Sequence, residues 1–268
     1  MQNRIKTLVL AVAACLALNP VSAQFTDTTG KPVPATDTVH RAINWSTPVP
    51  NNAFPLKSFI IPAALISYGV TSLGYHSLKD LNNNIKEEIA IEHPHHSIRV
   101  DDYLQYAPAL AVYGLNAAGI KGKHNFKDRT LLYGMSMLIS NSAVFSIKKF
   151  SGEMRPDESD FNSFPSGHTA NAFVAAEFMR QEYKDVSPWY GVAGYAVAAT
   201  TGYLRMYNNK HWFSDVVAGA GVGIASTRLA YWLYPMLKRG LSKNKNLNTV
   251  VMPTYQDGAV GLGLIHKF

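Results

Sequence analysis

The fold is indicated by two apolar stretches, WYGVAGYAVAATTGYLRM at residues 189–206 and VVAGAGVGIASTRLAYWLYPML at residues 216–237. Neither stretch alternates apolar and polar residues as a half-buried strand would, and each is long enough for several helical turns. Their many glycine and alanine residues allow the backbones of neighbouring helices to approach closely. The two stretches therefore predict helices with close helix contacts.

Four further apolar stretches come earlier, at residues 58–74, 103–120, 131–147 and 169–179. Some are shorter than the ~20 residues that a helix needs to cross a bilayer. Only 16% of the residues are charged, which is low for a soluble protein, yet the mean hydropathy is only −0.05. We predict an all-α helical bundle of about six core helices, membrane-embedded, with a periplasmic bundle that only sits on a membrane as the alternative.

The first 23 residues have the pattern of a secretory signal peptide. Arg4 and Lys6 form a positive start, an apolar core follows, and small residues precede a cleavage site after Ala23. An uncleaved membrane anchor and a lipoprotein signal at Cys15, the only cysteine, are the alternatives. All of them place the protein beyond the cytoplasm, in a bacterial cell envelope.

The rest of the chain divides into three parts. Residues 24–57 are rich in Thr, Pro and Asn and predict an extended segment. Residues 58–240 hold the apolar stretches, together with a helix at 77–92 that has one apolar face for a membrane surface or for the bundle. Residues 241–268 form a tail with a possible β-hairpin that turns at Asp257-Gly258.

The net charge of +7 suits a nucleic acid, an anionic membrane surface or a phosphorylated substrate. No basic stretch is interleaved with aromatic residues, which argues against nucleic acid. His93, His95 and His96 could suggest a metal, but Pro94 interrupts them. We therefore expect no metal and no other cofactor, and a lipid phosphate substrate at a membrane.

Three cations could surround a tetrahedral phosphate: Lys148, Arg155 and Arg205. The planar fork of arginine matches phosphate oxygens, and lysine adds a point charge. Ser166 and Gly167 precede a predicted helix, where backbone N–H groups and the positive helix end favour an anion. The sequence therefore predicts a phosphate-binding cradle.

A histidine and an aspartate, His211 and Asp215, lie four residues apart and would share one face of a helix. A carboxylate that accepts from one imidazole nitrogen leaves the other nitrogen free to act as a nucleophile. His168, from another segment, could protonate the leaving oxygen. Each feature also has a structural explanation, as a solvated charge, a turn or a helical pair, but their joint occurrence favours phosphoryl transfer.

These motifs resemble the signature of the type 2 phosphatidic acid phosphatase superfamily, which includes membrane lipid phosphatases, bacterial acid phosphatases and vanadium haloperoxidases. The family pattern is Lys-x6-Arg-Pro, then Pro-Ser-Gly-His, then Ser-Arg-x5-His-x3-Asp, and here it spans residues 148–215. The resemblance implies a metal-independent phosphatase in which His211 attacks phosphorus, Asp215 orients it and His168 protonates the leaving group. It implies five phosphate-binding residues: Lys148, Arg155, Arg205, Ser166 and Gly167.

Two positions depart from the expected pattern. Leu204 stands where the family has a serine before Arg205, so one phosphate hydrogen bond is lost or supplied elsewhere. The segment 157–164 between the first two motifs is short and begins with an acidic lip of Asp157, Glu158, Ser159 and Asp160. We expect this lip to shape which head group enters.

The leading hypothesis is a phosphatase for an envelope lipid: lipid A, isoprenyl diphosphate or a phosphatidyl lipid. The alternatives are a soluble periplasmic acid phosphatase, a vanadate-dependent haloperoxidase, and a binding protein with an inactive site. We place the enzyme in the inner membrane with its site facing the periplasm, because basic loops favour the cytoplasm. If the leader is cleaved, the number of membrane crossings would instead place the site in the cytoplasm, unless one apolar stretch does not span the membrane. The basic residues are Lys121, Lys123, Lys127, Arg129, Lys238, Arg239, Lys243 and Lys245.

Overall fold

The computed structural model describes residues 54–92, 96–243, 249–256 and 259–266. The predicted signal peptide and nearly all of the extended segment lie outside these residues and stay predictions. Within the described residues the chain is mostly helical, as predicted. The helices are α2 (Leu56–Ser72), α3 (His76–Lys86), the π-helix η1 (Glu87–Ile91), α4 (Asp101–Leu104), α5 (Ala107–Ala117), α6 (Phe126–Ser151), α7 (Gly167–Tyr183), α8 (Pro188–Tyr207) and α9 (Phe213–Lys243).

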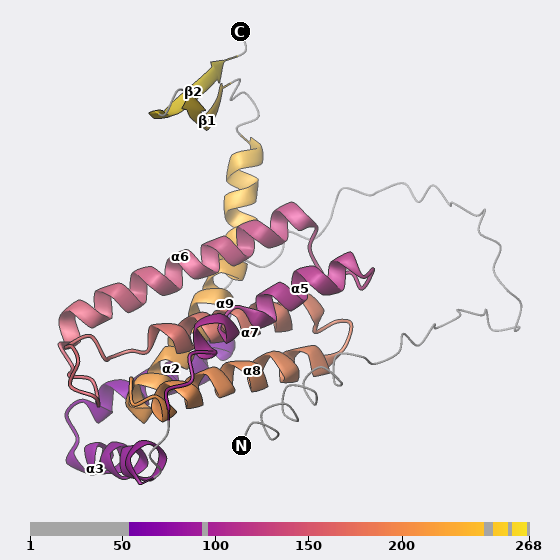
Figure 1. The fold of residues 1–268 in the computed structure, drawn as a ribbon. Helices are drawn as coiled ribbons and strands as arrows, with labels where there is room; N and C mark the ends of the chain where they lie inside the picture. The colour runs from indigo at the N-terminus through magenta and orange to yellow at the C-terminus, as the bar shows by residue number, and fades with distance from the viewer. Residues whose placement is uncertain (1–53, 93–95, 244–248, 257–258, 267–268) are drawn as a thin grey trace, which may run out of the picture. The chain divides into compact units, whose positions relative to one another are not determined.

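Helix α7 is the centre of the bundle and contacts α4, α5, α6, α8 and α9. Figure 1 shows α5, α6 and α8 around it, while α9 crosses their direction. The buried face of α7 includes four alanines, all of them fully buried, among them Ala170, Ala172 and Ala176. Small side chains let the helix axes approach closely, as the composition of the apolar stretches predicts.

Two glycines of α9 allow its backbone to touch α7. A Cβ atom at Gly219 would lie 2.6 Å from the carbonyl oxygen of Ser166, and one at Gly223 would lie 2.3 Å from that of Ala170. Both distances are far below van der Waals contact, so any side chain at either position would push the two helices apart. These contacts hold the first turns of α7 against α9.

Two helices are long and apolar enough to cross a membrane, namely α6 over Phe126–Ser151 and α9 over Phe213–Arg239. A third candidate is the pair formed by α2 and α3 with η1, which bends by 94°. The six apolar stretches thus give fewer candidate spans than six within the described residues. The stretch at 103–120 shows why, because it divides into α4 and the 11-residue α5, and 11 residues of helix extend only ~17 Å.

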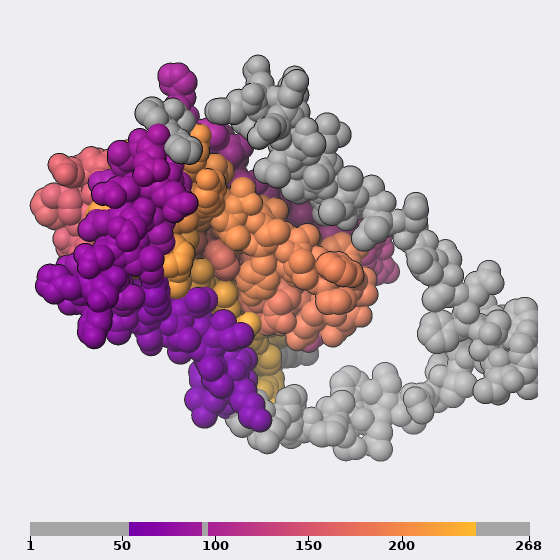
Figure 2. Space-filling view, turned by 90° about the horizontal axis from the view of Figure 1, so that it is seen from below, coloured from indigo at the N-terminus to yellow at the C-terminus, as the bar shows by residue number. Residues whose placement is uncertain are grey.

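The helix expected at 77–92 is α3 continued by η1, and its apolar residues Leu78, Ile85 and Ile89 are partly buried on the inward face. The buried residue of α3 is Asn82, while Leu81 is 39% exposed. Asn82 turns inward because its amide exchanges two hydrogen bonds with Ser214 of α9, at 2.9 Å to Oγ and 3.1 Å from the backbone N–H. Both α2 and α3 pack against α9, and they form the indigo-to-purple surface in Figure 2.

The tail carries two strands, β1 (Thr249–Gln256) and β2 (Ala259–His266). They pair antiparallel, from Thr249 opposite His266 to Gln256 opposite Ala259. The turn predicted at Asp257-Gly258 lies outside the described residues, so the hairpin stays a prediction and the role of this tail is not assigned.

Candidate active site

All three sequence motifs meet at one end of the bundle. Lys148 lies in the last turn of α6, and Arg205 lies in the last turn of α8. Ser166 is the N-cap of α7, and Asp215 lies in the first turn of α9. The positive N-terminal ends of two helices therefore lie beside basic residues at the ends of two others, an arrangement that favours an anion.

The histidine–aspartate pair is buried at the centre of this end. Nδ1 of His211 lies 3.4 Å from Oδ2 of Asp215, and the two residues are 4% and 0% exposed. His211 lies in the loop two residues before α9 and not on the helix itself, which corrects the prediction of a shared helix face. The first turn of α9 places Asp215 so that its carboxylate accepts from the backbone N–H of Trp212 at 2.9 Å.

A serine that the sequence did not single out binds the same oxygen of this carboxylate. The hydroxyl of Ser163 donates to Oδ2 of Asp215 at 2.5 Å. The backbone N–H of Ser166 donates to the carbonyl oxygen of Asp215 at 3.0 Å. Asp215 is therefore fixed by both its side chain and its backbone, so the direction in which it faces His211 is set by the packing of α7 on α9.

The pKa of His211 is lowered to about 4, mainly by burial. The charges of Lys148 and Arg205 act in the same direction, and Asp215 opposes them. The ring is therefore neutral at pH 7. A neutral imidazole that faces a carboxylate through Nδ1 carries its proton on that nitrogen, which leaves the lone pair of Nε2 available. This is the state that a histidine nucleophile requires.

The three predicted cations are each anchored. Nζ of Lys148 donates to the carbonyl oxygens of Asn162 and Ser163. Nε of Arg155 donates to Asp160 at 3.0 Å, and Nη1 of Arg205 donates to Asp101 at 2.5 Å.

Arg205 keeps one donor unused. Its Nε is buried and has no hydrogen-bond partner among the described residues. A phosphate oxygen at that edge of the guanidinium would satisfy it, since arginine offers donors on more than one edge.

The acidic lip pairs with basic residues, and its effect on which head group enters stays a prediction. Asp157 pairs with Lys210 at 2.5 Å, and Asp160 pairs with Arg155. Only Glu158 and Ser159 are exposed. The two aspartates therefore hold basic side chains in place, because a hydrogen bond between charged groups is stronger than one between neutral groups.

The Ser166-Gly167 turn differs in part from the anion-binding turn that the sequence predicts. The Ser166 hydroxyl accepts from Thr169, at 3.4 Å from its backbone N–H and 2.9 Å from its hydroxyl, and the side chain is fully buried. Ser166 therefore caps α7, while its own N–H is used by Asp215. The first N–H groups of a helix have no partner within the helix, so those of Gly167 and His168 are the groups of this turn that suit an anion.

Two acidic residues that sequence reasoning missed complete the site. Asp101 and Asp102 form the start of α4 and approach Arg205 and His168. The only signal in the sequence is an acidic pair before an apolar stretch, and nothing in its spacing connects it to His168 and Arg205, which lie more than 60 residues away.

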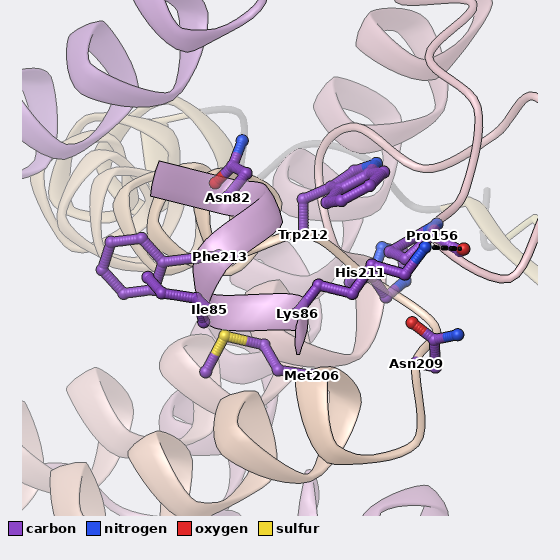
Figure 3. Close-up of a pocket in the computed structure, with 9 residues that line it drawn as sticks. All are labelled: Asn82, Ile85, Lys86, Pro156, Met206, Asn209, His211, Trp212 and Phe213. Atoms are coloured by element: carbon purple, nitrogen blue, oxygen red, sulfur yellow. Dashed lines mark hydrogen bonds between the residues drawn. The ribbon is translucent and has the colours of Figure 1, made fainter. Parts of the chain in front are cut away.

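Helix α3 covers the remaining side of His211. A small cavity of about 10 Å³ is lined there by nine residues, and Figure 3 shows Lys86 reaching over it to donate to the carbonyl oxygen of Pro156 at 2.8 Å. The lining residues are Asn82, Ile85, Lys86, Pro156, Met206, Asn209, His211, Trp212 and Phe213.

Among the described residues no group of three His, Cys, Asp or Glu side chains is placed to hold a metal ion. His93 and His95 lie outside the described residues, so the weak metal hypothesis for that tract is untested.

The fold and the site define a class of protein: helical bundles that hold a histidine–aspartate pair among cations at the ends of their helices. Residues 129–239 match the PAP2 superfamily, the type 2 phosphatidic acid phosphatases. The matched residues contain all three motifs at 148–215, in agreement with the resemblance that the motifs predict.

Two relatives and a solved structure illustrate what the chain is similar to. A "Lipid A 1-phosphatase" of Porphyromonas gingivalis is 40% identical over 142 residues, which cover 53% of this chain and 32% of the relative. One of Rhizobium johnstonii is 40% identical over 82 residues, covering 30% of this chain and 29% of the relative. The match thus covers about a third of the length of these relatives. A transmembrane PAP2 type phosphatidylglycerolphosphate phosphatase from Bacillus subtilis is 20% identical with a TM-score of 0.47, covering 68% of this chain and 97% of that one.

Proposed function

We propose that this chain is a phosphatase that removes phosphate from an envelope lipid through a phosphohistidine formed on His211. The observation that carries the proposal is the buried His211–Asp215 pair, in which the His211 ring is neutral at pH 7 and lies close to the charges of Lys148 and Arg205. A neutral nitrogen nucleophile in an electropositive, water-poor site is suited to attack on a phosphate ester.

The reaction proceeds in two transfers. Nε2 of His211 attacks phosphorus, the bond from phosphorus to the leaving oxygen breaks, and protonated His168 gives its proton to that oxygen. Water then attacks the phosphohistidine, neutral His168 accepts the proton of this water, and the phosphorus–nitrogen bond breaks. Inorganic phosphate leaves, and both histidines return to their starting protonation states.

The remaining residues stabilise charge. Lys148, Arg155 and Arg205 balance the negative charge on the phosphate oxygens during both transfers. Gly167 offers a backbone N–H at the positive end of α7, and Ser166 holds that end by capping it. Asp215 stabilises the positive charge that grows on His211 as the phosphorus–nitrogen bond forms.

The surface of α6 supports a place in a membrane. Leu131, Leu138 and Phe145 are 48%, 69% and 63% exposed. They follow at intervals of seven residues, so they lie on nearly one face of the helix. With 26 residues, α6 extends ~39 Å, more than the ~30 Å of a bilayer core. Such an apolar outer face suits lipid better than water.

Charge at the two ends of the bundle supports the orientation. The basic loop that contains Lys121 and Lys123 precedes α6, whereas Lys148 and the site lie at its end. Helix α9 begins at the site and ends beside the start of α6, where Lys238 pairs with Asp128 at 2.5 Å. Basic segments favour the cytoplasm, so the site end faces the periplasm if both helices span.

The similarity to proteins named lipid A 1-phosphatase makes lipid A the first substrate to test, with isoprenyl diphosphate and phosphatidyl lipids as the others. The test is phosphate release by the purified full chain in detergent with a chelator present. The substrates are lipid A, isoprenyl diphosphate and a soluble aryl phosphate, and the control is His211→Ala.

Release from lipid A that the variant loses would support the proposal. Faster turnover of the soluble ester would favour a periplasmic acid phosphatase instead. Activity that a chelator abolishes and a divalent ion restores would refute the mechanism.

A further inference from the structure

The acidic pair at the start of α4 contacts two residues of the candidate site. Oδ1 of Asp102 lies 3.0 Å from Nε2 of His168, and Oδ2 of Asp101 lies 2.5 Å from Nη1 of Arg205. The two contacts differ in burial. Asp101 is 1% exposed, while the side chains of His168 and Asp102 are 33% and 38% exposed. The His168–Asp102 contact therefore lies at the opening of the site.

Several hydrogen bonds fix Asp102 in this position. Gln105, which is 5% exposed, donates to the carbonyl oxygen of Asp102 at 2.8 Å. Asn171 of α7 donates to the side chain of Gln105 at 3.1 Å. The neighbouring Asp101 is held by Arg205 and, at 3.4 Å, by Asn208. The backbone of α4 is thus tied to α7 and α8, the helices that carry His168 and Arg205.

Opposite charges compete at the His168 ring. Burial and the charge of Arg205 on α8 lower the pKa of His168, whereas Asp102 and Asp101 on α4 raise it. Asp102 also faces Arg99, whose Nε lies 3.6 Å from its Oδ2 but whose side chain is 86% exposed. A residue that must donate a proton needs its protonated form near the working pH, and on this ring the aspartates of α4 are the groups that favour it.

We propose that Asp102 is a positioning residue that accepts a hydrogen bond from Nε2 of His168, fixes its ring and favours the imidazolium. Because Nε2 then faces Asp102, Nδ1 is the nitrogen that gives its proton to the leaving oxygen. It later takes a proton from the attacking water, while Nε2 keeps its hydrogen throughout. This assignment rests on the phosphatase function proposed above, in which His168 is the proton donor.

The first experiment compares leaving groups. In Asp102→Asn, kcat for an alkyl phosphate, whose leaving oxygen needs a proton, should fall about 10- to 100-fold, a part of the roughly 10²–10⁴-fold that general acid catalysis supplies. The kcat for 4-nitrophenyl phosphate, whose leaving group is stable as an anion, should fall less than about threefold. KM should stay nearly constant, and the alkaline limb of the kcat profile should move to lower pH.

Two variants control for structural damage. Asp102→Glu keeps the carboxylate and should restore most of the alkyl phosphate activity. Asp185→Asn makes the same chemical change at an exposed position at the other end of α7 and should match the wild type. An equal loss on both substrates, or an alkaline limb that does not move, would overturn the proposal.

A second readout does not depend on turnover. The pKa of His168, followed by NMR of the full chain in detergent and assigned by the resonance lost in His168→Gln, should be lower in Asp102→Asn than in the wild type. An unchanged pKa refutes the assignment whatever the activities are. If the wild type hydrolyses no substrate, the proposed function fails, and the pKa measurement alone then decides whether Asp102 favours the imidazolium.

Discussion

Replacing Asp215 by asparagine should slow the reaction while phosphate binding stays nearly unchanged. The amide has the shape of the carboxylate, so its oxygen can still accept from Ser163 and from the backbone N–H of Trp212. Oδ1 of Asp215 is buried without a partner among the described residues, so the new NH₂ group displaces no existing hydrogen bond. The variant should therefore fold, with a change in Tm of a few degrees at most.

The size of the effect follows from the lost charge. A hydrogen bond to a charged group contributes about 1.5–3 kcal/mol and one between neutral groups about 0.5–1.5 kcal/mol. The difference, about 1–2 kcal/mol, applies when His211 becomes positive, which happens as the phosphorus–nitrogen bond forms. At 1.4 kcal/mol per factor of ten, kcat should fall about 5- to 30-fold.

Protonation of His211 does not confound this measurement. Asp215 raises the pKa of His211 against the effect of burial, so removing its charge lowers that pKa further. The ring is then neutral at pH 7 in both proteins. The difference in kcat at pH 7 thus reports stabilisation of the transition state and not the fraction of active enzyme.

The assay is steady-state phosphate release from lipid A at pH 7, with inorganic phosphate as a competitive inhibitor to report affinity. Asp185→Asn is the matched control. A rise in KM and in the inhibition constant of phosphate, with kcat unchanged, would mean that Asp215 supports binding and would refute the assigned role. A variant as active as the wild type would refute His211 as the nucleophile that Asp215 orients.

Three other predictions follow from the same geometry. Arg205→Ala should raise KM and lower kcat, which steady-state kinetics measures. It should also lower the free energy of unfolding by about 3–5 kcal/mol, because Asp101 is left as a buried unpaired charge, and denaturant titration measures this loss. Since the pKa of His211 is about 4, titration of this ring should leave kcat/KM constant near neutral pH. Well below pH 4, kcat/KM should fall about tenfold per pH unit. An acid limb near pH 6.5 in the kcat/KM profile would contradict the buried neutral ring. Gly223→Ala should lower the free energy of unfolding by about 1–3 kcal/mol by overpacking α7 against α9, and an unchanged Tm would mean that this contact is looser than described.

The sequence predicted the helical character, and its motifs located a candidate site whose residue roles stay predictions, because both rest on local patterns. Apolar stretches without alternation became helices, and the three motifs meet at one end of the bundle. Asp101 escaped prediction because its role depends on a partner, Arg205, that lies 104 residues away. Leu204 in place of the family serine indicated that a hydrogen bond was missing, but nothing local identified what surrounds Arg205 in its absence.

The sequence left the number of membrane spans open for a related reason. Apolar composition indicates burial, and it does not distinguish burial in lipid from burial in protein. Helix α7 shows this, because its apolar residues face five other helices and it is only 17 residues long. Asn82 shows the converse, since a polar residue lies on the inward face of α3 where its amide pairs with Ser214.

The glycine contacts between α7 and α9 have a mechanical consequence. His168 is in the first turn of α7, and His211 lies in the loop that leads directly into α9, so both histidines adjoin the contact that the two helix backbones make at Gly219 and Gly223. Close-packed backbones transmit displacement with little deformation. In the membrane-embedded arrangement proposed above, a tilt of the surrounding helices with the thickness of the bilayer would move this pair as one stiff body, so the spacing between the two histidines would be insulated from the elastic state of the membrane.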